Sequence, residues 1–145
     1  MSRAAEDPVV SALQEALAGE HAAIYAYAVI GGRLDGDSAV VLQAIDSYAA
    51  HRAHRDALTA VLLARQESPV PTAPGYALPS PVEGSASARA LARRVEDRCG
   101  VLHAAVVATA TGDERSLGAD ALVACAERGF RWGAPATAFP GVGRA

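Results

Sequence analysis

Residues 10–34 read VSALQEALAGEHAAIYAYAVIGGRL, and this stretch decides the fold. Within it, one set of residues recurs at alternating intervals of three and four, the pattern of a helix that buries one stripe against neighbouring helices. The stripe comprises Val10, Leu13, Leu17, Glu20, Ile24, Tyr27, Gly31 and Leu34. A single member, Glu20, is a carboxylate. It must be paired, hydrogen-bonded, protonated or bound to a metal, because an isolated buried charge is too costly.

The composition favours one closely packed helical domain over residues 1–145. Half of the chain is hydrophobic (51%) but only 5% is aromatic, and alanine is abundant. The net charge is −3, with arginines spread among acidic residues, so we expect no nucleic-acid partner. The longest apolar run, residues 22–30, is too short to span a bilayer, and the N-terminus lacks a signal-peptide pattern. We therefore expect a cytoplasmic protein without a membrane contact, in which Cys99 and Cys125 are free thiols that fill the core.

Hydrophobic periodicity predicts an all-α four-helix bundle. Asp7 and Pro8 have the properties of a helix cap and a first helical residue. After the last helix, an irregular tail over residues 131–145 contains Trp132 and Phe139, which we expect to hold it against the bundle. The predicted helices span about residues 8–34, 38–66, 87–110 and 114–130.

Residues 67–86 separate the second and third predicted helices and contain five prolines, so they cannot be helical. A segment of this length is far longer than a hairpin needs, whereas in an extended conformation it can run the whole length of a helix. We predict a long Pro-rich crossover between two helical hairpins. A flexible hinge is the alternative, but each hairpin alone would be too small to fold independently.

Two histidines, His51 and His54, lie on the inner stripe of the second predicted helix. Reflecting the chain about a turn near residue 36 puts Glu20 opposite both. The same exercise for the second hairpin puts Glu96 within about one turn of Glu127. The crossover geometry decides whether both hairpins contribute to one polar layer.

Carboxylates and imidazoles that converge from several helices are typical of a dinuclear iron or manganese centre. Such a centre usually takes a Glu from each of two helices and Glu-x-x-His from each of the other two. The set here lacks a carboxylate on the second helix and an imidazole on the fourth, where residues 127–130 read ERGF. The candidate ligands are Glu20, His51, His54, Glu96 and Glu127, and the candidates for the groups around them are Arg55, Asp56 and His103.

The same residues can instead form a buried polar network that fixes the register of the helices without any cofactor. Arg55 could then neutralise Glu20 or Glu96 through its planar guanidinium group. The short ligand set favours this interpretation, in which the protein acts by self-association as a homodimer or by binding another partner. A degenerate metalloprotein with oxidoreductase or metal-handling activity is the alternative.

Five segments together resemble a bacterial family of ferritin-like domains of unknown function. They are EHAAIYAY (20–27), HRAHRD (51–56), YALP (76–79), ED (96–97) and FPG (139–141). The resemblance covers nearly the whole chain. It implies a ferritin-like four-helix bundle and no established activity.

The resemblance also marks motif positions. Those that match are Glu20, His51, Arg55, Asp56 and Glu96. His54 departs from the pattern, because similar sequences more often have Arg at that position.

Overall fold

The computed structural model describes residues 7–34 and 39–142, and these residues form four helices and no strand. The helices are α1 (Pro8–Arg33), α2 (Ala39–Ala64), α3 (Ser85–Thr109) and α4 (Gly112–Arg131). The predicted all-α four-helix bundle is therefore confirmed, and every helix end lies within two residues of its predicted position. The turn expected near residue 36 lies outside the described residues. None of the four helices is apolar over a stretch long enough to cross a membrane.

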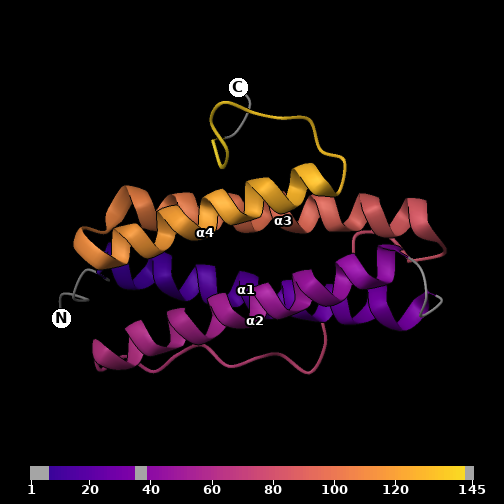
Figure 1. Cartoon of the computed structure of the whole chain (residues 1–145). Helices are drawn as coiled ribbons and strands as arrows, with labels where there is room; N and C mark the ends of the chain where they lie inside the picture. Colours follow the sequence, from indigo (N-terminus) through magenta and orange to yellow (C-terminus); the bar gives the residue numbers. More distant parts are fainter. Residues whose placement is uncertain (1–6, 35–38, 143–145) are drawn as a thin grey trace.

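The bundle has two layers, each an antiparallel helix pair (Figure 1). One layer contains α1 and α2, and the other contains α3 and α4. α1 packs along both α2 and α3, and α3 packs along α4, whereas α2 and α4 touch only sparsely. The weak α2–α4 contact leaves one side of the bundle less tightly closed than the others.

Local contacts explain where the helices begin and end. Asp7 caps α1 as predicted, because its Oδ1 accepts a hydrogen bond of 2.9 Å from the backbone N–H of Val9. α2 stops before Gln66, whose φ of 62° lies in the left-handed region that a helix cannot contain. α3 begins two residues before its predicted start, since the Ser87 hydroxyl accepts a hydrogen bond from the backbone N–H of Gly84.

The segment between α2 and α3 runs along the length of the bundle (Figure 1). Near the start of α1, the Gln14 side chain accepts a hydrogen bond of 2.8 Å from the backbone N–H of Val70. Further along α1, the rings of Tyr25 and Tyr76 lie 5.6 Å apart. Val82 is then buried in the apolar cluster that contains the end of α1. These contacts follow the order of α1, so the Pro-rich segment returns the chain to the end of the bundle where α3 starts.

Two apolar clusters flank a polar centre. One cluster is built around Tyr27, Ile30 and Trp132, and the other around Leu13 and Leu58. Polar side chains that are 5% exposed or less occupy the core with them. They are Glu20, Ser47, His51, Glu96, His103 and Arg128.

Trp132 fastens the end of α4 to this core as predicted. Its side chain is completely buried, its ring stacks on Tyr27 with centroids 6.0 Å apart, and its Nε1–H donates to the Ser47 hydroxyl at 3.3 Å.

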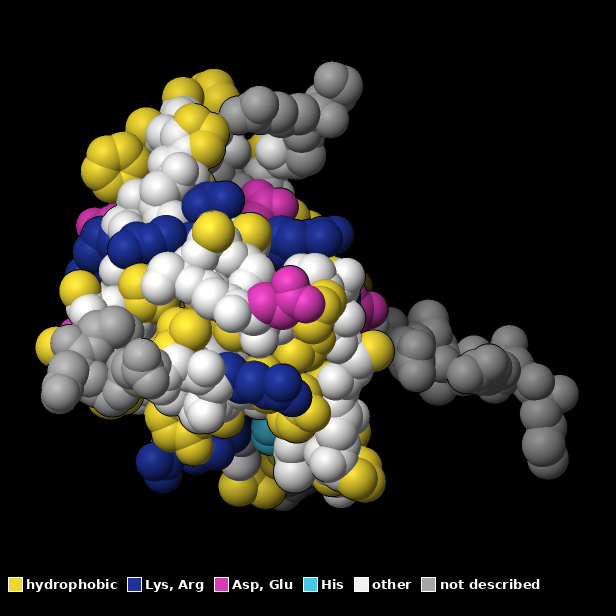
Figure 2. Space-filling model, turned by 90° about the vertical axis from the view of Figure 1, so that its right-hand side faces the viewer, with side chains coloured by type: hydrophobic (Ala, Val, Ile, Leu, Met, Phe, Trp, Pro, Cys, Tyr) yellow, Lys and Arg dark blue, Asp and Glu magenta, His cyan; other side chains and the backbone are white. Residues whose placement is uncertain are grey.

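The expectation that Phe139 also packs on the bundle is wrong, because its side chain is 74% exposed. Gly141 makes the close contact instead. Its φ of 75° favours glycine, and a Cβ there would lie 2.7 Å from the Gly100 carbonyl oxygen. Figure 2 shows hydrophobic side chains exposed on the C-terminal segment, at the top of the molecule.

Candidate metal centre

Glu20 is surrounded by imidazoles from two helices. Its Oε2 lies 2.6 Å from His51 Nδ1, and its Oε1 lies 2.7 Å from Nε2 of His103 on α3. His54 Nδ1 lies 3.6 Å from Oε1, a close approach that is too long for a hydrogen bond. Three imidazoles therefore share one completely buried carboxylate.

Glu96 has a different set of partners. Its Oε1 accepts from the Tyr27 hydroxyl at 2.6 Å and lies 3.0 Å from Nε2 of His51. Arg128 on α4 places Nε 3.1 Å from Oε1 and 3.2 Å from Oε2. A guanidinium group thus caps this carboxylate.

His51 joins the two carboxylates, because each of its ring nitrogens faces one of them. Both nitrogens can donate only when the ring is protonated. Burial alone would lower the pKa of His51, but the neighbouring Glu20 and Glu96 carboxylates outweigh it and raise that pKa. His51 and Arg128 then supply two positive charges that balance the two carboxylates.

The same contacts keep both carboxylates ionised. Burial would raise the pKa of Glu20, but hydrogen bonds to His103 and His51 hold it well below its usual range. For Glu96, burial is outweighed by His51 and Arg128, so the pKa of this carboxyl is also lowered.

Two ring nitrogens in this part of the structure have no hydrogen-bond partner. They are Nδ1 of His103 and Nδ1 of His54, and both atoms are buried. Buried polar atoms without a partner are uncommon in proteins and call for a specific explanation, such as a bound ion.

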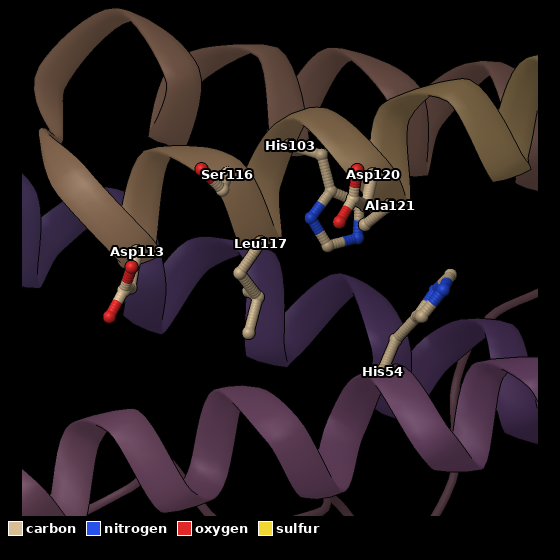
Figure 3. Close-up of a pocket in the computed structure, with 7 residues that line it drawn as sticks. All are labelled: His54, His103, Asp113, Ser116, Leu117, Asp120 and Ala121. Atoms are coloured by element: carbon tan, nitrogen blue, oxygen red, sulfur yellow. The ribbon is translucent and has the colours of Figure 1, made fainter.

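Both imidazoles line a cleft of about 340 Å³ between α2 and α4. Figure 3 shows His54 and His103 pointing toward each other across it. Asp113 and Asp120 on α4 line the same cleft. An acidic cleft is therefore lined by two of the three imidazoles that surround the buried Glu20 carboxylate.

Two overlapping groups of donor atoms are close enough to hold a metal ion. In each group, the donor atoms of the three residues lie within 4.8 Å of one another. One group is Glu20, His51 and His54, and the other is His54, His103 and Cys125. The cluster could hold a metal, and His54 belongs to both groups.

Comparison with known proteins identifies the family. The family described as Domain of unknown function (DUF4439) matches residues 12–144. The chain belongs to this family. It is also similar to a conserved hypothetical protein from Mycobacterium tuberculosis, whose crystal structure superimposes with a TM-score of 0.81 at 34% sequence identity. That match covers 91% of this chain and 96% of the other. A comparison with curated proteins found no match.

The side chains of this DUF4439 chain do not fit a dinuclear carboxylate centre. Arg128 occupies the carboxylate of Glu96, where a second metal would have to bind. Glu127, a predicted ligand, is exposed on the surface of α4. The inward face of α4 carries Ala121, Cys125 and Arg128, at spacings of four and three, and this register turns residue 127 away.

Arg55 and Asp56 of the DUF4439 motif do not join the cluster either. The Arg55 guanidinium pairs with the Asp56 carboxylate at 2.7 Å, and Asp56 is 67% exposed. The prediction that Arg55 neutralises Glu20 or Glu96 is therefore wrong. His103, predicted among the groups around the ligands, contacts Glu20 directly.

Arg128 was not predicted, although the sequence contains a signal for it. Residue 128 lies three positions after Cys125 and seven after Ala121, so it falls on the inner stripe of α4. The periodicity that singled out Glu20 would also have selected Arg128.

Proposed function

We propose that this protein binds one divalent transition-metal ion beside Glu20 and that it has a metal-handling role. The observation that carries the proposal is the buried imidazole of His103, which contacts the ionised Glu20 carboxylate through Nε2 and leaves its Nδ1 without a partner. His54 adds a second unpartnered nitrogen at the same place. Imidazole nitrogens with a carboxylate oxygen are a common ligand set for zinc, iron and manganese.

Each residue of the cluster has a distinct role in this proposal. Glu20, His54 and His103 would bind the ion. His51 would keep its contact with Oε2 of Glu20 and fix the orientation of that carboxylate, as outer partners of metal ligands commonly do. A single ion is proposed because Arg128 already provides the positive charge beside Glu96.

The cleft between α2 and α4 supports the proposal because it gives the ion a route to its ligands. Asp113 and Asp120 line it, and both residues are exposed. Carboxylates along a cleft raise the local concentration of cations. A metal site needs such a path as well as its ligands.

Isothermal titration calorimetry of the chelator-stripped full chain tests this function. We expect one Zn²⁺ per chain, and titrations with Mn²⁺ and with anaerobic Fe²⁺ compare the two metals that the sequence suggested. His103→Gln should weaken Zn²⁺ binding by more than about tenfold, the least expected even for an outer partner of a ligand.

The matched control is His21→Gln. His21 follows Glu20 directly, but its Nε2 lies 3.0 Å from the Val70 carbonyl oxygen, outside the cluster. This variant should bind Zn²⁺ as the wild type does. Absence of binding in the wild type, or equal binding by His103→Gln, would overturn the proposal.

Self-association as a homodimer is a second candidate, in which the polar core has only a structural role. The observation that favours it is a set of exposed large hydrophobic side chains at the end of α4 and in the tail. Phe130, Phe139 and Val142 are 62%, 74% and 69% exposed. Adjacent exposed apolar side chains are typical of interaction surfaces.

Sedimentation equilibrium tests this second candidate. A dimer should form with rising protein concentration, and Phe130→Ser should weaken it. Leu42→Ser, which changes a 59% exposed residue on α2, should leave it intact. A monomer at all concentrations would eliminate the candidate.

A further inference from the structure

Cys125 reaches the proposed metal site from α4. Its side chain is 1% exposed, and its sulfur lies within 4.8 Å of a ring nitrogen of both His54 and His103. His103 is itself 1% exposed and has an unpartnered nitrogen in this region. The cysteine therefore faces a buried imidazole that has an unused lone pair or N–H group.

We infer that the Cys125 thiolate completes the site as its fourth ligand, and that the site selects a thiolate-binding ion of the zinc class over manganese or magnesium. This inference rests on the function proposed above. Each helix would contribute one ligand: Glu20 from α1, His54 from α2, His103 from α3 and Cys125 from α4. A mixed nitrogen, oxygen and sulfur set of four is typical of tetrahedral zinc.

The four ligands come from the two groups of donor atoms that share His54, and one ion would draw these groups together around it. Bonds of about 2.0–2.3 Å to a tetrahedral ion place neighbouring donor atoms roughly 3.3–3.7 Å apart. Oε1 of Glu20 lies 3.6 Å from Nδ1 of His54 and 2.7 Å from Nε2 of His103. The donor atoms of His54, His103 and Cys125 lie within 4.8 Å of one another. Because α2 and α4 touch only sparsely, a shift of one against the other meets little packing.

Arg128 supports the negative charge that a thiolate ligand brings. Its Nη2 lies 3.4 Å from the sulfur of Cys125, while its Nε contacts Glu96. On metal binding, the S–H bond breaks, the proton leaves to the buffer, and the sulfur donates an electron pair to the ion. No oxidant or reductant is involved in this step.

Cys99 provides a matched control. It lies in the same apolar cluster as Cys125 and is equally buried. Its sulfur, however, approaches the Gly19 carbonyl oxygen at 3.8 Å, and it belongs to neither group of donor atoms.

Absorption spectroscopy of the Co²⁺-loaded full chain tests the inference. The wild type should show a near-ultraviolet thiolate-to-cobalt charge-transfer band together with the visible bands of tetrahedral cobalt. Cys125→Ser should lose the charge-transfer band, and Cys99→Ser should keep it. Excess Mn²⁺ should not displace the cobalt, whereas Zn²⁺ should.

The outcomes separate this inference from the function on which it rests. Co²⁺ that binds to the wild type without a charge-transfer band would overturn the role of Cys125 and leave the proposed metal site standing. The same holds if Cys99→Ser abolishes the band and Cys125→Ser does not. No Co²⁺ binding at all would overturn both. Cys99 and Cys125 are the two cysteines of the chain, so a band that persists in Cys99→Ser assigns the thiolate to Cys125 even if Cys125→Ser fails to fold.

Discussion

Glu20 and Glu96 are both buried carboxylates on the same histidine, yet their surroundings differ. Glu96 is held by a guanidinium, a phenol and His51, and these donors leave it balanced within the protein. Glu20 is held by imidazoles, two of which keep an unpartnered nitrogen and line an open cleft. On the Glu96 side of the polar core, the Arg128 guanidinium already provides the positive charge. The Glu20 side has donor groups that could hold a cation from solution.

Removing the Arg128 guanidinium should have the largest effect on stability. Arg128→Met would leave Glu96 without its guanidinium partner, and breaking a buried ion pair costs about 3–5 kcal/mol. Urea unfolding with chelator present measures this loss. Arg131→Met, an exposed change one turn further along α4, should stay within about 0.5 kcal/mol of the wild type. A loss as small as that of the control would show that Arg128 does not hold Glu96.

The pH dependence of the stability of the metal-free protein should report on His51, which joins the Glu20 and Glu96 carboxylates. The pKa values of Glu20 and Glu96 are lowered from 4.5, so their stabilisation is present above that pH and is lost as the pH falls below it. The pKa of His51 is raised from 6.5, so its stabilisation is complete below that pH and is lost as the pH rises above it. The free energy of unfolding should therefore be highest between about pH 4.5 and 6.5.

Urea unfolding from below pH 4.5 to above pH 6.5 tests whether His51 joins the two carboxylates in its protonated form. The informative variant is His51→Gln. This variant should remove the decline above pH 6.5, and His21→Gln should retain it. A wild-type profile without that decline would mean that His51 is not protonated between the carboxylates.

The smallest effect on stability is expected at Ser47, at the edge of the Glu96 side of the polar core. Ser47→Ala removes the acceptor for Trp132 Nε1–H and should cost about 1 kcal/mol in urea unfolding. Ser116→Ala, on the exposed surface of α4, should cost less. Zn²⁺ affinity should not change in Ser47→Ala. If the Zn²⁺ affinity of Ser47→Ala fell as far as that of His103→Gln, the Glu96 side would also contribute to metal binding, which contradicts the comparison.

Periodicity explains why much of this architecture could be predicted. Glu20 and His51 lie on stripes that alternate between three and four residues, and an antiparallel pair of helices must bring such stripes together. The prolines between α2 and α3 exclude a helix, and the length of that segment excludes a hairpin. Each of these inferences needs only the pattern of a single helix or a single hairpin.

Contacts between hairpins were less predictable, because they depend on how closely the helices approach. A Cβ on Gly19 would displace the end of the Leu102 side chain, so glycine at this position lets α1 and α3 come close at the level of Glu20 without that rearrangement. At Gly118, a Cβ would lie 2.9 Å from Val106, and the same argument applies to α4 against α3. These approaches bring His103 to Glu20. The glycines can be identified in the sequence, but the alignment of the helices that makes them necessary cannot.

Anomalous diffraction from crystals of the Zn²⁺-loaded protein tests the central difference between the two sides most directly. We expect one zinc peak beside Glu20, at about 2.0–2.3 Å from its ligands, with Arg128 still on Glu96. A second zinc between Glu20 and Glu96, displacement of Arg128 from Glu96, or no bound zinc would contradict it.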